Sequence, residues 1–219
     1  MAITLNGTTG ITSTGITETS DGNVGFGTSS PLNRLTTRAT ANSYAGGNLS
    51  LESAGGANAT YFAQTTLGDF YISNGGGADH IKLDSAGRVT MPYQPSFMAT
   101  SSQNNQSGII NFDGTHYNVG GHFSTSTNKF TAPVAGTYFF SWSTVMGSNI
   151  SGSTIQIRKN GTSLSYTAVY TGDNLSAHQT YPSSTICVIH YLSVGDYVEV
   201  YASPTIQANY GGFVGYLIG

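Results

Sequence analysis

The chain has 219 residues, only 8% of them charged, and a formal net charge of −3. An ordinary globular domain carries about 25% charged residues, and the few Lys and Arg residues here form no cluster that could neutralise nucleic-acid phosphates, which excludes nucleic acid as a partner. Disorder is also excluded, because disordered chains have few aromatic residues, whereas this chain has 14 Tyr and 10 Phe.

The N-terminus lacks the basic start and apolar block of a signal peptide, and no apolar stretch is long enough to span a membrane. We therefore expect a protein that is made in a cytoplasm, with no signal peptide and no membrane insertion. The single cysteine, Cys187, excludes an intrachain disulfide. It lies in the apolar run 185–189, which predicts a buried structural thiol rather than a nucleophile.

Alternating apolar and polar residues recur along the chain with turn residues between the runs, which predicts an all-β protein. Residues 1–20 have too few apolar side chains for a core, so they either order against a partner or form a free terminus. Residues 21–93 are short strand-like runs broken by glycine clusters. They predict small hairpins with little core of their own, and therefore lateral association of chains.

Residues 94–219 contain longer strands, as expected for a two-sheet jelly roll. The strand at 138–146 places Tyr138, Phe140, Trp142 and Met146 on one face, so Trp142 is expected in the core rather than in a ligand site.

Turn signals separate these strands. Asn160-Gly161 predicts a tight hairpin, because both residues tolerate positive φ. Further turns are expected at 133–136 and 193–196.

The strand at 185–192 is apolar on both faces. Ile186, Val188 and Leu192 alternate with a second set, which comprises Cys187, Ile189 and Tyr191. The core of one sandwich hides only one of these sets, so a subunit interface is expected to hide the other. The pattern predicts a homo-oligomer, and the family resemblance of residues 94–219 implies that it is a homotrimer.

Four stretches of residues 94–219 resemble the globular head of the complement C1q-like family, within the tumour-necrosis-factor-like superfamily. They are Phe-Thr-Ala-Pro-Val-Ala-Gly-Thr-Tyr-Phe-Phe at 130–140, Lys-Asn-Gly at 159–161, Leu-Ser-Val-Gly-Asp-Tyr-Val at 192–198, and Phe-Val-Gly-Tyr-Leu-Ile at 213–218. The resemblance implies a ten-stranded jelly roll, a tight homotrimer, and ligand recognition rather than catalysis.

The N-terminal part resembles bacteriophage tail fibres instead of a collagen-like stalk. Its matching stretches are 1–12, the Gly-Asn-Val-Gly-Phe-Gly-Thr-Ser-Ser-Pro motif at 22–31, and the connector-like residues 83–92. This resemblance implies an attachment segment at 1–20 that binds other virion tail proteins, a β-rich intertwined shaft at 21–93, and a head at 94–219. A virion protein assembled in a bacterial cytoplasm needs no signal peptide.

The chain shows no pattern typical of an enzyme or a cofactor site. The glycines at 22–27 are followed by Thr-Ser-Ser-Pro rather than by a helix or a Gly-Lys-Ser/Thr motif, which disfavours a phosphate loop. The five histidines have no metal-ligand spacing, although one ligand per chain on a trimer axis stays open. No Ser/His/Asp set or carboxylate pair can be assigned. We therefore expect no enzyme, no cofactor and no metal.

Connections in an antiparallel jelly roll alternate between its two ends. Since the shaft enters near Gln94, the connections 101–107, 147–153, 171–180 and 203–209 are expected at the far end. These are long and polar, as binding loops usually are. The candidate receptor contacts are Asn149, Asp173, Asn174, His178, Gln207 and Asn209.

The sequence thus predicts a tail-fibre protein whose trimeric head recognises a host-surface receptor, either a glycan or a surface protein. A purely structural virion decoration protein and a polysaccharide-degrading tailspike are the alternatives. The tailspike would need paired carboxylates in a groove and a longer chain.

Overall fold

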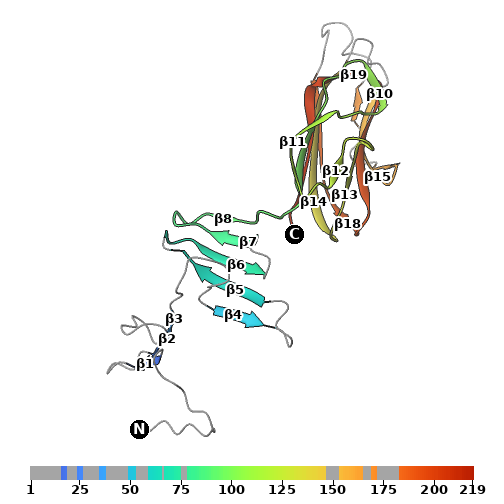
Figure 1. Ribbon diagram of the computed structural model, residues 1–219. Coiled ribbons are helices and arrows are strands. Elements are labelled where there is room, and N and C mark those ends of the chain that lie inside the picture. Colours follow the sequence, from blue (N-terminus) through green and yellow to red (C-terminus); the bar gives the residue numbers. More distant parts are fainter. Residues whose placement is uncertain are drawn as a thin grey trace. The chain divides into compact units, whose positions relative to one another are not determined.

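Every regular element that the structure describes is a β-strand, as the alternating pattern predicted (Figure 1). The chain separates into two units, Met1–Pro92 and Tyr93–Gly219. In the described ranges no helix is long and apolar enough to cross a membrane. The computed structural model describes residues 16–18, 24–26, 35–37, 49–52, 59–65, 67–74, 78–146, 153–164, 169–171 and 183–219.

The first unit contains two sheets. The smaller one has the order β1-β2-β3, with β2 antiparallel to β1 and parallel to β3. The larger one is an antiparallel meander in the order β4-β5-β6-β7-β8 (Figure 1). The strands are β1 (Ile16–Glu18), β2 (Val24–Phe26), β3 (Leu35–Thr37), β4 (Leu49–Glu52), β5 (Ala59–Gln64), β6 (Phe70–Asn74), β7 (Ala78–Leu83) and β8 (Val89–Thr90).

Two aspartates fix the turns of this meander. Asp84 accepts hydrogen bonds from the backbone N–H groups of Ala86 and Arg88, each at 2.9 Å, and closes the turn at 85–87. Asp69 pairs with the ammonium of Lys82 at 2.9 Å and accepts a hydrogen bond from the Ser85 N–H. These contacts hold the pKa of both carboxyls below the usual range. The meander is therefore specified by its turns more than by a core.

A fragment of residues 1–93 is expected to be unfolded or aggregated when it is made alone. Of the unit's described side chains only Ser73 is buried, whereas Leu67 and Val89 are 78% and 61% exposed. An open layer of this kind buries too little apolar surface to offset chain entropy. Circular dichroism during heating tests this expectation, with residues 93–219 as the matched fragment that should melt cooperatively. A cooperative transition in the monomeric 1–93 fragment would contradict it.

The second unit contains the remaining strands, β9 to β19, joined in one hydrogen-bonded network. They are β9 (Ser96–Thr100), β10 (Gln106–Ile109), β11 (Gly114–Val119), β12 (Phe123–Ser124), β13 (Lys129–Thr131), β14 (Gly136–Met146), β15 (Ser153–Lys159), β16 (Thr162–Ser163), β17 (Val169–Thr171), β18 (Ser183–Leu192) and β19 (Tyr197–Leu217).

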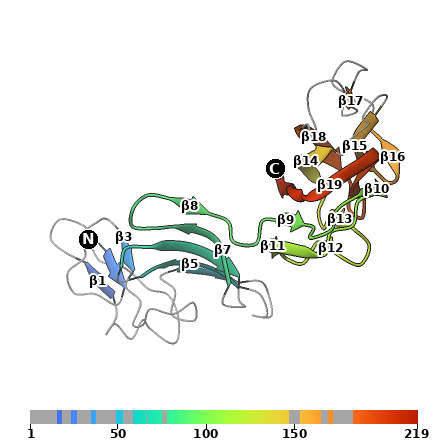
Figure 2. The same cartoon turned by 90° about the horizontal axis from the view of Figure 1, so that it is seen from above.

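These strands form two rows that share β19. The first row is β11-β9-β19-β14-β18, and its part of β19 is residues 212–217. The second is β12-β13-β19-β15-β17, and its part is residues 197–202. Strands β14 and β18 lie side by side in both views (Figure 1 and Figure 2). Two rows of five strand segments are the jelly roll that the sequence predicted.

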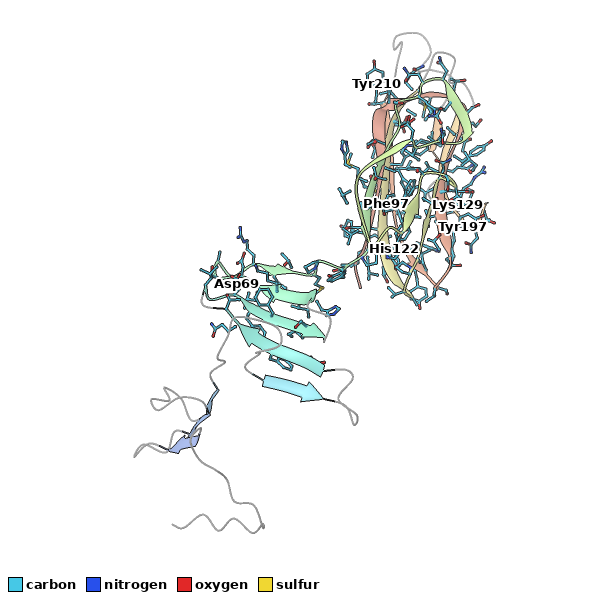
Figure 3. The ribbon with its side chains drawn as sticks, in the orientation of Figure 1. Asp69, Phe97, His122, Lys129, Tyr197 and Tyr210 are labelled. Carbon is cyan, nitrogen blue, oxygen red and sulfur yellow. The ribbon has the colours of Figure 1, made fainter. Side chains whose placement is uncertain are left out.

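The core of the second unit lies between the two rows. Along β14 buried and half-buried residues alternate without interruption, and Trp142 is 1% exposed, which confirms its expected place in the core. The Phe97 ring is central to an aromatic cluster, 4.8 Å from Phe123 and 5.0 Å from Phe213 between ring centroids (Figure 3). The largest fully buried side chains are Trp142, Tyr138, Phe97, Phe112, Phe130, Phe140, Phe213, Ile110, Met146, Ile155, Ile157 and Leu192.

Candidate functional site

Strand β14 connects the two ends of the second unit. Its first residue, Gly136, pairs with Leu192, and the adjacent Thr137 N–H donates to the Gly219 carbonyl at 2.7 Å. The Leu217 N–H donates to Pro95 at 3.0 Å, so the start of β9 and the C-terminus share this end, which we call the base. Met146, the last residue of β14, pairs with Ile206 at the opposite, far end.

Since connections alternate between the two ends, the turns at 133–136, 160–161 and 193–196 are expected at the base. Hydrogen bonds link these turns to one another. Asn160 and Gly161 have φ of 51° and 79°, as a tight Asn-Gly hairpin requires. The Asn160 side chain donates to Asp196 at 2.7 Å and accepts from the Tyr197 N–H at 2.9 Å. The backbone of Ala132 exchanges two hydrogen bonds with 195–196. Short specified turns therefore close this end.

Lowering the pH should destabilise the base of the head through protonation of Asp196. Its hydrogen-bonded ion pair with Lys159, at 2.8 Å, and its hydrogen bonds from Asn160 and Ser193 lower its pKa from 3.8 to about 2. A carboxyl with a depressed folded-state pKa stabilises the fold above its unfolded pKa, and that contribution disappears as the pH falls toward the folded value.

We expect Asp196→Asn to lower the urea midpoint above pH 3.8, and the difference from the parent protein to shrink toward pH 2. The difference between the two proteins isolates Asp196 from the other carboxyls. Urea titrations across this range measure it, and a gap that stays constant with pH would rule out the assignment.

The far end brings two of the predicted segments together. The Gln207 side chain, in 203–209, donates to the Asn105 side chain, in 101–107, at 2.9 Å. Beside this contact lies a hollow of about 500 Å³, whose described lining residues are Asn104, Val145, Gln207 and Tyr210. Tyr210 lies at the far end of the head (Figure 3). The hollow thus joins the end of β14, the segment after β9 and the middle of β19.

Side chains fasten the segment 101–106 to the head. Asp113 accepts hydrogen bonds from the Ser102 N–H, at 2.9 Å, and from the Ser102 hydroxyl, which lower its pKa. The Gln106 amide donates to the Ser101 hydroxyl and accepts from the Asn111 N–H at 2.7 Å. Asn105 has a φ of 56°, which an asparagine tolerates better than most residues. Hydrogen bonds therefore fasten this wall of the hollow on both sides of Asn104.

Two expectations for the far end were wrong in detail. Residues 203–209 are not a separate loop, since β19 continues through them, and residues 106–107 already belong to β10. The reason is pairing that the sequence did not reveal: Gln106 pairs with Ile206, and Gly108 pairs with Ala202. Ladder hydrogen bonds replace the freedom of a loop, so this part of the far end is more rigid than expected.

The six candidate contacts divide into two groups. Gln207 lines the hollow, and Asn209 is exposed further along the same strand. The other four lie outside the described residues: Asn149, Asp173, Asn174 and His178.

Sequence reasoning missed Asn104, Val145 and Tyr210 as lining residues. Asn104 lies in the predicted connection 101–107, and Tyr210 directly follows the predicted connection 203–209. The polar run before Tyr210 is the only sequence signal that indicates its position at the far end of the head.

The outer face of the first row is apolar. Register places Ile189 beside Phe139 and Phe139 beside Tyr216, and the Phe139 and Tyr216 ring centroids are 5.2 Å apart. Ile189 and Tyr216 are 61% and 45% exposed in the single chain. We call this surface the outer apolar face; it consists of Met98, Tyr117, Phe139, Cys187, Ile189, Tyr191, Val214 and Tyr216.

Cys187 belongs to this face and is exposed, so the expected buried thiol was wrong for the single chain. The alternation of β18 explains the error. Ile186 and Val188 are buried, and Cys187 between them must point to the opposite side of the sheet.

The outer face of the second row has a different chemistry. The Lys129 ammonium lies 3.8 Å from the Tyr197 ring centroid and 3.9 Å from a Glu199 carboxylate oxygen (Figure 3). The Arg158 guanidinium lies 3.4 Å above the Tyr201 ring. Both cations are therefore already paired with groups of the same chain. The two outer faces therefore differ in what they are suited to contact.

Within the described ranges, no three His, Cys, Asp or Glu side chains gather as a metal site would require. The far-end hollow is lined, as far as the structure describes it, by amides, a phenol ring and an aliphatic side chain. This set suits non-covalent binding through hydrogen bonds and apolar contact.

A search of curated proteins with this sequence finds no match. Among solved structures, the globular domain of zebrafish complement 1qA protein is similar at 16% sequence identity, with a TM-score of 0.40, over 57% of this chain and 98% of that one. The family model described as the C1q domain matches residues 96–218. Because this match covers more than half of the sequence, the chain belongs to the C1q-domain family.

Proposed function

We propose that this chain is the tail-fibre protein of a bacteriophage and that its head binds a receptor on the host surface. The C1q domain is often a trimeric recognition module and is typically not an enzyme. The observation that carries the proposal is the far end of the head, where a hollow lined by amide, phenol and aliphatic side chains opens opposite the base. Binding residues on a rigid scaffold, at the end away from the chain's entry, suit an adhesin.

The head assembles as a homotrimer through the outer apolar face. A monomer that left Ile189, Tyr191 and Tyr216 in water would expose neighbouring large apolar groups, which soluble proteins avoid. The other outer face already pairs its charges with rings and a carboxylate. Burial of the first face between copies therefore removes the most unfavourable surface of the described head.

The phage context rests on the N-terminal sequence. The motif at 22–31 and the connector at 83–92 resemble tail fibres, and the open meander of the first unit suits a shaft that gains its core from association. In this proposal residues 1–20 attach to other virion tail proteins, 21–93 form an intertwined shaft, and 94–219 form the head. The protein then resides in the virion, after assembly in the host cytoplasm.

Adsorption to cells tests the receptor role. The full-length protein, labelled with a fluorophore, is incubated with a panel of intact bacterial strains, and bound fluorescence is measured. The triple variant Asp173→Ala, Asn174→Ala, His178→Ala is expected to lose adsorption while it keeps its oligomeric state. Ser193→Ala, at the base, is the matched control and should adsorb as the parent does.

Three results would argue against this proposal. Adsorption to none of the strains favours a decoration protein. Loss of adsorption in Ser193→Ala alone places the site at the base. Release of shortened sugars from surface polysaccharide during the incubation favours a tailspike.

A further inference from the structure

We infer that the hollow at the far end binds one neutral sugar unit of a surface glycan. The inference rests on the proposed receptor role and names the ligand class of that site. It starts from the four described lining residues: the amides of Asn104 and Gln207, the ring of Tyr210 and the methyl groups of Val145.

The polar groups of the hollow match the hydroxyl groups of a sugar. Each side-chain amide offers two N–H donors and a carbonyl acceptor, and a hydroxyl needs both kinds of partner. Gln207 spends one N–H on Asn105, at 2.9 Å, which fixes the orientation of its amide and leaves its carbonyl oxygen and second N–H for a ligand. The same contact prevents the amide from rotating freely before the ligand arrives.

The apolar groups match the C–H faces of a sugar. Tyr210 is 67% exposed, so its ring offers a wide apolar surface together with a hydroxyl at its edge. Val145 adds aliphatic contact at the end of β14. A ligand with one apolar face and a rim of hydroxyls satisfies both halves of this lining, whereas a purely apolar ligand would leave the amides without partners.

The backbone holds these side chains in place. Val145 pairs with Gln207 in the ladder between β14 and β19. A Cβ on Gly211 would lie 1.9 Å from the Ser143 carbonyl oxygen, so only glycine lets β19 approach β14 here, directly after Tyr210. The opposite wall is fastened by Asp113 and Gln106. The described part of the site is therefore preorganised, which lowers the entropic cost of binding.

Charge and size restrict the ligand further. The described lining residues carry no formal charge, and a charged ligand that loses water without gaining a countercharge binds poorly. The volume of about 500 Å³ falls in the range of roughly 300–1,000 Å³ typical of small-ligand sites. The uncharged lining therefore favours a neutral sugar unit over a sialic or uronic acid.

Saturation-transfer NMR on the full-length protein tests the inference. The probes are glucose, galactose, mannose and N-acetylglucosamine, with glucuronic acid as the charged comparator. At least one neutral sugar should receive magnetisation from the protein, and glucuronic acid should receive none. Tyr210→Ala and Gln207→Leu should each weaken that binding about tenfold or more. Tyr93→Ala and Gln64→Leu, which change exposed residues of the same types outside the described lining, should leave it unchanged.

The inference is overturned if no neutral sugar receives magnetisation, if glucuronic acid binds equally well, or if Tyr210→Ala has no effect. Cell adsorption separates this failure from failure of the receptor role. Adsorption that periodate treatment of the cells abolishes supports a glycan. If only protease treatment abolishes adsorption, the receptor role stands but the sugar ligand is refuted. Sugar binding without adsorption to any strain keeps the site and overturns the receptor role.

Discussion

Replacing Ile189 by aspartate should convert the proposed trimer into monomers or aggregates. Ile189 lies in the outer apolar face, next to Phe139 on the adjacent strand, and is 61% exposed before assembly. In the trimer this carboxylate would be buried without a partner, which costs about 3–5 kcal/mol, and each trimer contains three copies. Multi-angle light scattering at micromolar concentration measures the result.

The matched control for this prediction is Val134→Asp. Val134 is 45% exposed in the turn before β14 and does not belong to the outer apolar face, so the same charge there should leave the trimer intact. A trimeric Ile189→Asp variant would refute this interface. A parent protein that is a stable monomer at the same concentration would refute the trimer itself.

Much of the head could be predicted because its strands alternate cleanly. Alternation alone assigns Tyr138, Phe140 and Trp142 to one face, and the structure buries all three. The Asn160-Gly161 hairpin was predictable because only a few residue pairs tolerate two positive φ values in succession. Both features depend on local interactions, so a single sequence is enough to predict them.

The rest depends on contacts between segments far apart in the chain. Nothing in residues 106–109 indicates that they pair with 201–206. This pairing puts 203–209 and the last two residues of 101–107 into strands. The exposure of Cys187 likewise depends on which side of β18 faces the core. Tyr210 and Asn104 line one hollow only because the middle of β19 and the segment after β9 both lie at the far end. The hollow could therefore not be read from either segment alone.

Association through the outer apolar face should also affect the strength of binding at the hollow. A weak site for a single sugar gains strength when a trimer presents three copies to a surface with repeated sugars, provided that the geometry lets them bind together. Ile189→Asp should therefore weaken adsorption to cells strongly but leave sugar binding by each chain nearly unchanged. Equal losses in both assays would mean that the hollow is shaped by the interface.

Gly215→Ala should destabilise the head more than a glycine substitution nearby on the same strand. Gly215 lies between Phe97 on β9 and Phe140 on β14, and a Cβ there would come within 2.6 Å of both rings. Both rings are fully buried in the aromatic cluster and cannot move aside without disturbing their neighbours. Overpacking of this kind costs about 1–3 kcal/mol and sometimes more.

The matched substitution is Gly212→Ala, whose Cβ would lie 3.1 Å from the terminal methyl of Met98, a flexible side chain that can yield. Chemical unfolding followed by Trp142 fluorescence compares the two variants with the parent. The Gly215 variant should unfold at clearly lower denaturant, and the Gly212 variant close to the parent. Equal midpoints for the two variants would mean that the ring cluster tolerates an added methyl, so that close packing against Phe97 and Phe140 is not what requires glycine in the Phe-x-Gly stretch of the last strand.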